Sequence, residues 1–326
     1  MSSSAVSAPR RRTGLFRDVT DIRAFIAALP PFDNVSLAAR RASYDRAASL
    51  FPLPADVAVE AVDAGGVPAE RLSVPASTAA SSVLYLHGGA YVLGSLDSHR
   101  HLGAAIARAT EGTVLMLDYR LAPEHPFPAA LDDALAAYRS MLDDGQPSSR
   151  IVIAGDSAGD GLAVATMLAA RDEGLPLPAA AALIAPWVDL SCKSATCEFK
   201  DPLVNPTRAR ESAASYLAGI DPRTPLASPL FGDLRGLPPL LIQAASEEVL
   251  LGDARALDRV AREQDVRSTL ELTPDVVHVW YWFAPILREG REAIARMAEF
   301  IRTETAADPA HRRSPRCSSD EAILRV

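Results

Sequence analysis

The chain has 326 residues, with 41 acidic against 33 basic side chains and a net charge of −8. This balance argues against a nucleic-acid surface, and no apolar run approaches the ~20 residues that a membrane-spanning helix needs. The length allows one large core with an insertion, and we expect a cytoplasmic protein. Cys192, Cys197 and Cys317 are odd in number and lack metal-ligand spacing, so they are expected to be free thiols.

Both ends of the chain are predicted to be tails. Residues 1–14 are rich in Ser, Ala and Arg, and residues 306–326 mix Pro, Arg, Ser and Asp without periodicity. Between residues 15 and 29 the apolar side chains recur at helical spacing until a Pro-Pro pair stops them. This helix either packs on the body of its own domain or forms part of a lid, and the sequence favours neither.

From about residue 57 short apolar segments alternate with longer helical ones. Strands are predicted near 57–62, 70–74, 82–86, 113–118, 150–155, 180–185, 240–245 and 267–272. Helices are predicted near 97–110, 128–143, 158–172, 253–265 and 289–303. Several of the strands are apolar throughout, as expected for parallel strands with helices on both faces. The fold class is therefore α/β, with a mostly parallel eight-stranded sheet flanked by helices.

One interval breaks this alternation, from Trp187 to about Pro239. It mixes Pro, Asp, Ser and Arg around a short helical piece at 208–218. So long a connection between two strands predicts an insertion that folds over the carboxyl edge of the sheet, where open α/β proteins bind ligands.

The strand at 150–155 runs directly into Gly155-Asp156-Ser157-Ala158-Gly159 and then into a helix. A serine on such a strand-to-helix turn needs small neighbours, because strand and helix pass too close for a Cβ. Ser157 is therefore the candidate nucleophile. An ordinary Gly-Ser turn is the alternative, and the neighbouring motifs argue against it.

The strand at 82–86 ends in His87-Gly88-Gly89-Ala90-Tyr91, a loop whose glycines allow backbone N–H groups to turn toward a substrate oxygen. With the elbow downstream, this loop is more than a plain connection. We predict that the N–H groups of Gly88, Gly89 and Ala158 form an oxyanion hole.

A serine nucleophile needs a base and an acid that orients it. His278 follows the last predicted strand and precedes an aromatic cluster, so its place in the chain suits the base, although a histidine beside aromatics is often only a core residue. Glu247 and Glu248 follow the strand at 240–245 and are both candidates for the acid. Asp253 is a third, but it is better placed to cap the next helix.

Four motifs together resemble the hormone-sensitive-lipase-like (family IV) bacterial esterases. They are His87-Gly88-Gly89-Ala90, the segment 118–124 (Asp-Tyr-Arg-Leu-Ala-Pro-Glu), Gly155-Asp156-Ser157-Ala158-Gly159 and the segment 274–278 (Pro-Asp-Val-Val-His). The resemblance extends over residues 20–305. It implies an α/β-hydrolase fold and a serine carboxylesterase for short to medium acyl chains, with no metal or cofactor.

The resemblance also implies a domain plan and a triad. Residues 1–50 would form a tail and cap helices, 51–186 with 240–305 the catalytic domain, 187–239 the rest of a helical cap, and 306–326 a tail. The triad would be Ser157, His278 and Glu248, with the segment 118–124 buttressing the oxyanion loop. Three positions depart from the family pattern: Glu248 where Asp is common, Ala90 in place of a third glycine, and Asp160 where a small residue is frequent.

The same catalytic groups would also serve a lactone or amide hydrolase. A ligand-binding protein on this fold is a further alternative, which the presence of His278 disfavours. Tyr91, Asp156, Trp187 and Tyr216 are candidates for the substrate pocket, although the aromatic residues could be plain packing. The expected partner is a small ester, with no nucleic acid and no membrane, and a homodimer is left open.

Overall fold

The computed structural model describes residues 18–28, 35–78, 80–194 and 201–306. Its strands are β1 (Ala58–Asp63), β2 (Pro68–Ser73), β3 (Ser82–Leu86), β4 (Thr113–Leu117), β5 (Ile151–Asp156), β6 (Ala180–Ile184), β7 (Leu240–Ala245) and β8 (Ser268–Thr273). They form one sheet in the order β1-β2-β4-β3-β5-β6-β7-β8. The pairs β1–β2 and β2–β4 are antiparallel and all others are parallel. The prediction of a mostly parallel eight-stranded sheet is confirmed.

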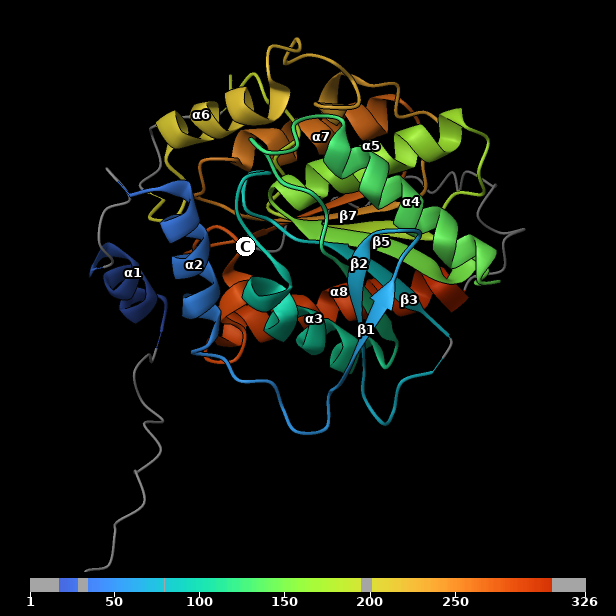
Figure 1. The fold of residues 1–326 in the computed structure, drawn as a ribbon, viewed down its shortest axis with the longest axis horizontal. Helices are drawn as coiled ribbons and strands as arrows, with labels where there is room; N and C mark the ends of the chain where they lie inside the picture. The colour runs from blue at the N-terminus through green and yellow to red at the C-terminus, as the bar shows by residue number, and fades with distance from the viewer. Residues whose placement is uncertain (1–17, 29–34, 79, 195–200, 307–326) are drawn as a thin grey trace, which may run out of the picture.

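Helices cover both faces of the sheet (Figure 1). They are α1 (Val19–Ala28), α2 (Leu37–Ala48), α3 (Leu96–Thr110), α4 (Ala129–Asp143), α5 (Ala158–Asp172), α6 (Pro206–Leu217), α7 (Leu251–Glu263) and α8 (Arg288–Ala306). Three 3₁₀ turns are η1 (Ser148–Arg150), η2 (Pro229–Phe231) and η3 (Trp280–Phe283). Helices α4, α5 and α7 pack on one face, and α3 and α8 pack on the other. None of the described helices is long and apolar enough to cross a membrane.

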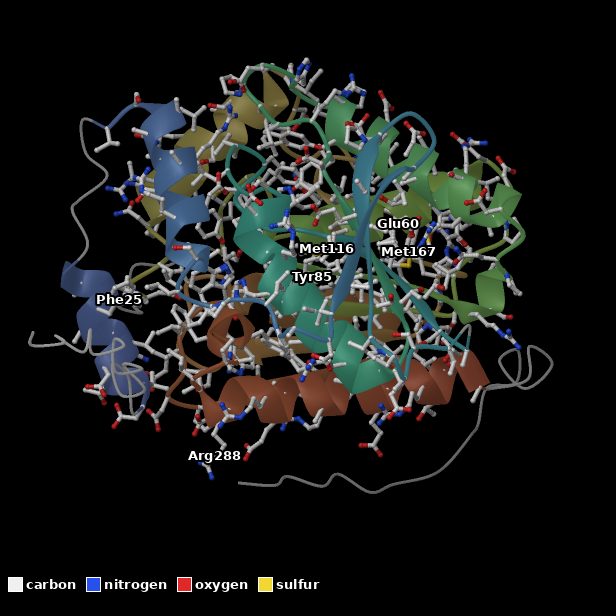
Figure 2. The ribbon with its side chains drawn as sticks, turned by 60° about the horizontal axis from the view of Figure 1, so that its bottom comes forward. Phe25, Glu60, Tyr85, Met116, Met167 and Arg288 are labelled. Carbon is white, nitrogen blue, oxygen red and sulfur yellow. The ribbon has the colours of Figure 1, made fainter. Side chains whose placement is uncertain are left out.

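Two buried cores follow from this arrangement, and β3 shows why its sequence is apolar throughout. Leu84 and Leu86 enter the core under α4 and α5, whereas Val83 and Tyr85 enter the core under α3 and α8. Successive side chains of a strand point to opposite faces, so a strand that is covered on both sides needs an unbroken apolar run. Figure 2 shows Tyr85 inside the molecule beside Met116, its partner in the β3–β4 register.

Helix α2 is an element that the sequence pattern did not predict. The segment is mixed in polarity and buries only Ala48 among its residues, so it lacks the apolar stripe on which the other helix predictions depended. Its local signal is the N-cap Ser36, whose hydroxyl accepts a hydrogen bond from the Ala39 N–H at 3.2 Å. The helical piece in the insertion is present as α6. The predicted tail 1–14 lies outside the described residues, and so does the predicted tail 306–326 except for Ala306, which ends α8. Cys197 and Cys317 also lie outside them, whereas Cys192 is a buried free thiol.

Candidate active site

Ser157 lies on the tight turn between β5 and α5. Its backbone has φ 55° and ψ −115°, a conformation that L residues rarely adopt and that costs about 1–3 kcal/mol. The surroundings fix this turn, because the Ser157 N–H donates to the Ile184 carbonyl at 2.8 Å and the Ser157 carbonyl accepts from the Trp187 N–H at 3.0 Å. The strained serine is thus anchored to the end of β6 and to the chain that follows it.

The two glycines of the elbow are required by close approach. A Cβ at Gly159 would collide with the backbone carbonyl of Leu86 on the neighbouring strand. A Cβ at Gly155 would lie 2.7 Å from that same oxygen and 2.7 Å from the Gly159 carbonyl carbon, closer than real Cβ atoms come to backbone. The crossing of strand and helix that the motif predicted is therefore present, and it leaves no room for a side chain at either position.

His278 follows β8 and pairs with Glu248, which follows β7. The imidazole Nδ1 lies 2.5 Å from Glu248 Oε2, and both side chains are buried. Glu248 Oε1 accepts a second hydrogen bond, from the Ala245 N–H at 3.0 Å. A carboxylate on Nδ1 fixes the tautomer of the ring and leaves Nε2 as the acceptor nitrogen.

The rival acids lie elsewhere. Glu247 is exposed. Asp253 is buried in the first turn of α7, where one of its oxygens accepts the N–H groups of Val188 and Asp189, both at 2.9 Å. The geometry therefore selects Glu248 from the candidates that the sequence left open.

The charges around His278 favour its protonated form. Burial opposes the imidazolium, but Glu248 beside the ring outweighs it, with further contributions from Asp201 and Asp156, so the pKa of His278 is raised above its usual value. Burial also raises the pKa of the Glu248 carboxyl, and the neighbouring imidazole offsets part of that effect. This pair therefore holds a proton more strongly than an exposed histidine does.

Ser157, Glu248 and His278 follow β5, β7 and β8, and so lie at the same carboxyl edge of the sheet. In the described part of the chain the acid and the base are hydrogen-bonded to each other, whereas the serine and the histidine are not. Catalytic hydrogen bonds are often long before substrate binds, so this separation is compatible with a working pair.

The loop after β3 does not use all the N–H groups that the sequence analysis assigned to it. The Gly88 N–H donates to Asp156 Oδ1 at 2.9 Å, so the prediction that it serves an oxyanion hole is wrong, because one N–H supplies one hydrogen. Gly89 has φ 119°, and Ala90 adopts a left-handed φ of 55° although it is not glycine. The hydrogen bonds of the described residues include no acceptor for the N–H groups of Gly89, Ala90 and Ala158.

Asp156 is an anchor for this loop, and its predicted role in a substrate pocket stays a prediction. The residue is only 1% exposed. Its carboxylate accepts from the Tyr85 hydroxyl at 2.7 Å and from Gly88, and it lies 3.4 Å from His99 Nε2. Burial opposes its charge, but these partners outweigh burial and lower the pKa of Asp156. A buried anion thus ties the loop after β3 to the residue before Ser157.

The segment 118–124 buttresses the same loop, as the family resemblance implied. The Tyr119 hydroxyl donates to the His87 carbonyl at 2.6 Å, and the two rings stack with centroids 4.3 Å apart. The Ala122 N–H donates to the Tyr91 carbonyl at 2.9 Å. Burial lowers the pKa of His87 to about 3, so this histidine is a neutral packing element.

Helix α2 reaches the loop through Arg41. Its guanidinium donates to the Val92 and Ala122 carbonyls at 2.8 and 2.9 Å and forms a bidentate pair with Glu124, with both bonds at 2.8 Å. The helix that the sequence pattern missed therefore holds the oxyanion loop against the 118–124 segment.

The three aromatic candidates for the pocket are packed together. Tyr91, Trp187 and Tyr216 are each at most 2% exposed, and the Tyr91 ring stacks on Tyr216 of α6 with centroids 3.8 Å apart. These contacts join the oxyanion loop to the insertion. A role as pocket wall stays a prediction.

Asp160 is fully buried in the first turn of α5, three residues after Ser157. Neither of its carboxylate oxygens has a hydrogen-bond partner among the described residues. Burial, reinforced by the charge of Asp156, raises the pKa of Asp160 well above its usual value. The carboxyl therefore favours its neutral form, which spares the elbow an unpaired charge beside the paired one of Asp156.

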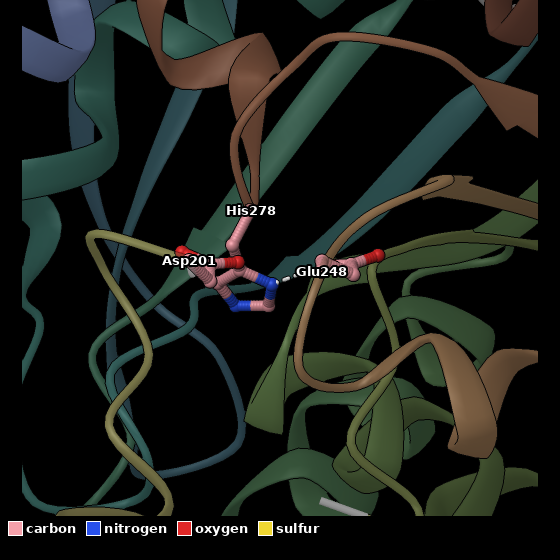
Figure 3. Close-up of side chains that lie close together, drawn as sticks. All are labelled: Asp201, Glu248 and His278. Atoms are coloured by element: carbon pink, nitrogen blue, oxygen red, sulfur yellow. Dashed lines mark hydrogen bonds and ion pairs between the residues drawn. The ribbon is translucent and has the colours of Figure 1, made fainter. Parts of the chain in front are cut away.

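Asp201 is a residue that the sequence analysis missed. One carboxylate oxygen of Asp201, one of Glu248 and one ring nitrogen of His278 lie within 4.8 Å of one another (Figure 3). Carboxylates and imidazoles are common metal ligands, but here His278 Nδ1 and Glu248 Oε2 are already hydrogen-bonded to each other. No local pattern marks this residue as functional, because an aspartate before proline in a long connection is typical of a turn.

Comparisons with known proteins agree with the fold. A family model of the α/β-hydrolase fold matches residues 83–282. An acetyl-hydrolase of Streptomyces hygroscopicus is 50% identical over 275 residues, which cover 83% of this chain and 92% of that protein. An esterase of Acinetobacter venetianus is 35% identical over 271 residues, covering 82% and 89%.

Solved structures are similar over most of the chain. One is described as an esterase from the bacterial hormone-sensitive lipase family, with 46% identity, a TM-score of 0.84, and coverage of 88% of this chain and 97% of that one. Another is the esterase EstE5 soaked with p-nitrophenyl butyrate, with 44% identity, a TM-score of 0.84, and coverage of 89% and 99%. The chain therefore belongs to the α/β-hydrolase fold family, and within it to the hormone-sensitive-lipase-like esterases that its motifs resemble.

Proposed function

We propose that Ser157, His278 and Glu248 are the catalytic triad with which this chain, a carboxylic ester hydrolase, cleaves its substrates. The observation that carries the proposal is the 2.5 Å contact between His278 Nδ1 and Glu248, at the same sheet edge as a serine in a strained elbow. With Nδ1 bound to the carboxylate, Nε2 is free to take the Ser157 proton as the hydroxyl attacks the ester carbonyl.

The N–H groups of Gly89, Ala90 and Ala158 would receive the oxyanion. Support comes from their position beside the elbow and from the lack of any competing acceptor in the described residues. Collapse of the tetrahedral intermediate expels the alcohol, which takes its proton from His278, and leaves an acyl group on Ser157. Water, deprotonated by His278, then releases the acid.

We propose short to medium acyl chains as substrates and a cap made of helices α1 and α2 together with the insertion 187–239. The acyl preference is supported by the name acetyl-hydrolase of the Streptomyces relative and by the p-nitrophenyl butyrate used with EstE5. The cap is supported by α6, whose Tyr216 stacks on the oxyanion loop, and by α2, whose Arg41 binds it. Hydrolysis rates for p-nitrophenyl butyrate, a lactone and an anilide would separate an esterase from a lactonase or an amidase.

The test of the triad is Ser157→Ala, assayed with p-nitrophenyl butyrate. Loss of the nucleophile should lower kcat by several orders of magnitude, because the triad acts as a unit. A serine-directed phosphonate should label wild-type Ser157, as read by peptide mass spectrometry, and should leave the variant unlabelled. Ser140→Ala, on α4, is the matched control and should keep wild-type turnover. Wild-type activity in Ser157→Ala would reject the proposal.

A further inference from the structure

We propose that Asp201, in the insertion between β6 and β7, is a positioning residue for the reaction: a second carboxylate that stabilises the imidazolium form of His278. The inference rests on the proposed function, since it assigns the histidine as base. It adds a residue that links the insertion to the chemistry of the triad.

The geometry places a second acid beside the base. Glu248 reaches the imidazole from the loop after β7, and Asp201 reaches it from the chain just before α6 (Figure 3). In this view the two carboxylates flank the ring of His278. One carboxylate oxygen of Asp201, one of Glu248 and one ring nitrogen of His278 all lie within 4.8 Å of one another. Charges at this separation in a buried site are strongly coupled.

The Asp201 side chain is held in place by its own backbone. Oδ1 accepts the N–H groups of Leu203 and Val204, at 2.8 and 3.3 Å, an arrangement typical of aspartate at a turn. Oδ2 is buried and has no hydrogen-bond partner among the described residues. A fixed carboxylate with one oxygen unpaired keeps its charge available to the neighbouring ring.

The charged groups around His278 come from several elements. Three are acidic: Glu248 after β7, Asp201 in the insertion and Asp156 at the end of β5. One is basic, since Arg23 of α1 donates to the Val276 carbonyl at 3.3 Å, two residues before the histidine. The acidic groups dominate, and they raise the pKa of His278 although burial opposes its charge.

The negative charge of these carboxylates affects one step of the reaction, the attack of Ser157 on the ester. When Ser157 attacks, its proton passes to His278, and the neutral ring becomes an imidazolium. A carboxylate beside the ring stabilises that charge in the transition state more than it stabilises the neutral ground state, so it should raise kcat. Because Asp201 acts through the histidine, the interaction should leave KM unchanged.

The test is Asp201→Asn, with p-nitrophenyl butyrate as substrate. An asparagine keeps the turn acceptor and removes the charge. We expect kcat at pH 8 to fall about tenfold with KM unchanged, and the acid limb of the kcat/KM profile to move about one pH unit lower, as expected when a nearby anion is lost. Asp201→Glu keeps the charge, so its acid limb should stay near that of wild type.

Asp221→Asn is the matched control. Asp221 lies in the same insertion and accepts a turn hydrogen bond from the Arg223 N–H at 2.8 Å, but it is exposed and is not among the groups that shift His278. This variant should keep the wild-type acid limb and kcat. If Asp201→Asn does not fold, Asp201→Ser, which keeps a turn-forming oxygen without the charge, is judged by the same two readouts.

A wild-type acid limb in the uncharged variant would overturn the inference, even if kcat fell, because a purely structural loss lowers turnover without moving the pKa of the base. This failure differs from failure of the proposed function. In the first case Ser157→Ala is inactive and only the role of Asp201 is lost. In the second, Ser157→Ala is active and the triad itself is wrong.

Discussion

The backbone N–H of Gly88 donates to the Asp156 carboxylate across 2.9 Å, and this one bond joins the loop after β3 to the elbow after β5. The two segments form the two sides of the proposed oxyanion hole, so their separation must be held constant. A Cβ at Gly88 would collide with the same carboxylate, which explains why a glycine is needed there. Gly88 thus has a structural role, and the donors proposed for the oxyanion are Gly89, Ala90 and Ala158.

Removing one partner of Asp156 should destabilise the protein. Tyr85→Phe deletes the hydroxyl that donates to this buried carboxylate at 2.7 Å. A hydrogen bond to a charged group contributes about 1.5–3 kcal/mol, so the free energy of unfolding should fall by that amount in urea denaturation. Turnover should fall only slightly, because the Gly88 N–H and His99 still contact the Asp156 carboxylate and hold it in place.

Tyr138→Phe is the matched control for this measurement. Its hydroxyl also donates a 2.6 Å hydrogen bond and its ring is also buried, but the acceptor is the neutral carbonyl of Pro176. A neutral hydrogen bond contributes about 0.5–1.5 kcal/mol. Equal losses in the two variants would show that Asp156 carries no charge in the folded protein.

Converting the proposed triad acid into an amide should nearly abolish turnover. Glu248→Gln can neither stabilise the imidazolium nor enforce the tautomer of His278, so kcat should fall by about 10³- to 10⁴-fold. Glu247→Gln changes the neighbouring residue in the same way, but Glu247 is exposed and should be silent. The comparison uses kcat for p-nitrophenyl butyrate, and similar losses in both variants would leave Glu248 without its assigned role.

Much of the fold could be predicted because the strands are buried on both faces. The run from Ile151 to Ala154 is apolar throughout because alternate residues enter opposite cores, and such runs mark parallel strands. The elbow could be predicted for a related reason. Only glycine fits where α5 crosses the Leu86 carbonyl. The glycines of the motif are therefore required by the close packing of helix on strand, and not only by the chemistry expected of the serine.

The features of the fold and of the site that could not be predicted depend on contacts between segments far apart in the chain. No local pattern shows that Gly88 gives its N–H to Asp156, or that Asp201 reaches His278 from an insertion. Which of Glu247 and Glu248 contacts His278 likewise depends on how the chain turns after β7. Val279, a β-branched residue with a φ of 49° directly after His278, is a further feature that propensity disfavours and that tertiary packing imposes.

Asp160 should be a source of instability that increases with pH. Its carboxyl is buried without a hydrogen-bond partner in the described chain, and burial raises its pKa well above 3.8. A carboxyl with a raised pKa binds its proton more tightly in the folded state than in the unfolded one. Stability from this group is therefore greatest at low pH and is lost as the pH rises from about 3.8 through the folded pKa.

Asp160→Ala removes the group and its unpaired oxygens. We expect the free energy of unfolding at neutral pH to rise by about 1–3 kcal/mol, the cost of a buried unsatisfied polar group. The gain should shrink as the pH is lowered, because the carboxyl of the unfolded wild type also takes up its proton as the pH approaches 3.8. Urea denaturation of the two proteins at pH 4.5 and pH 7.5 measures this difference. A gain that is the same at both pH values would mean that Asp160 carries the same charge in the folded and unfolded states, so that folding does not raise its pKa, and a loss of stability at neutral pH would mean that its carboxyl has a partner that stabilises it.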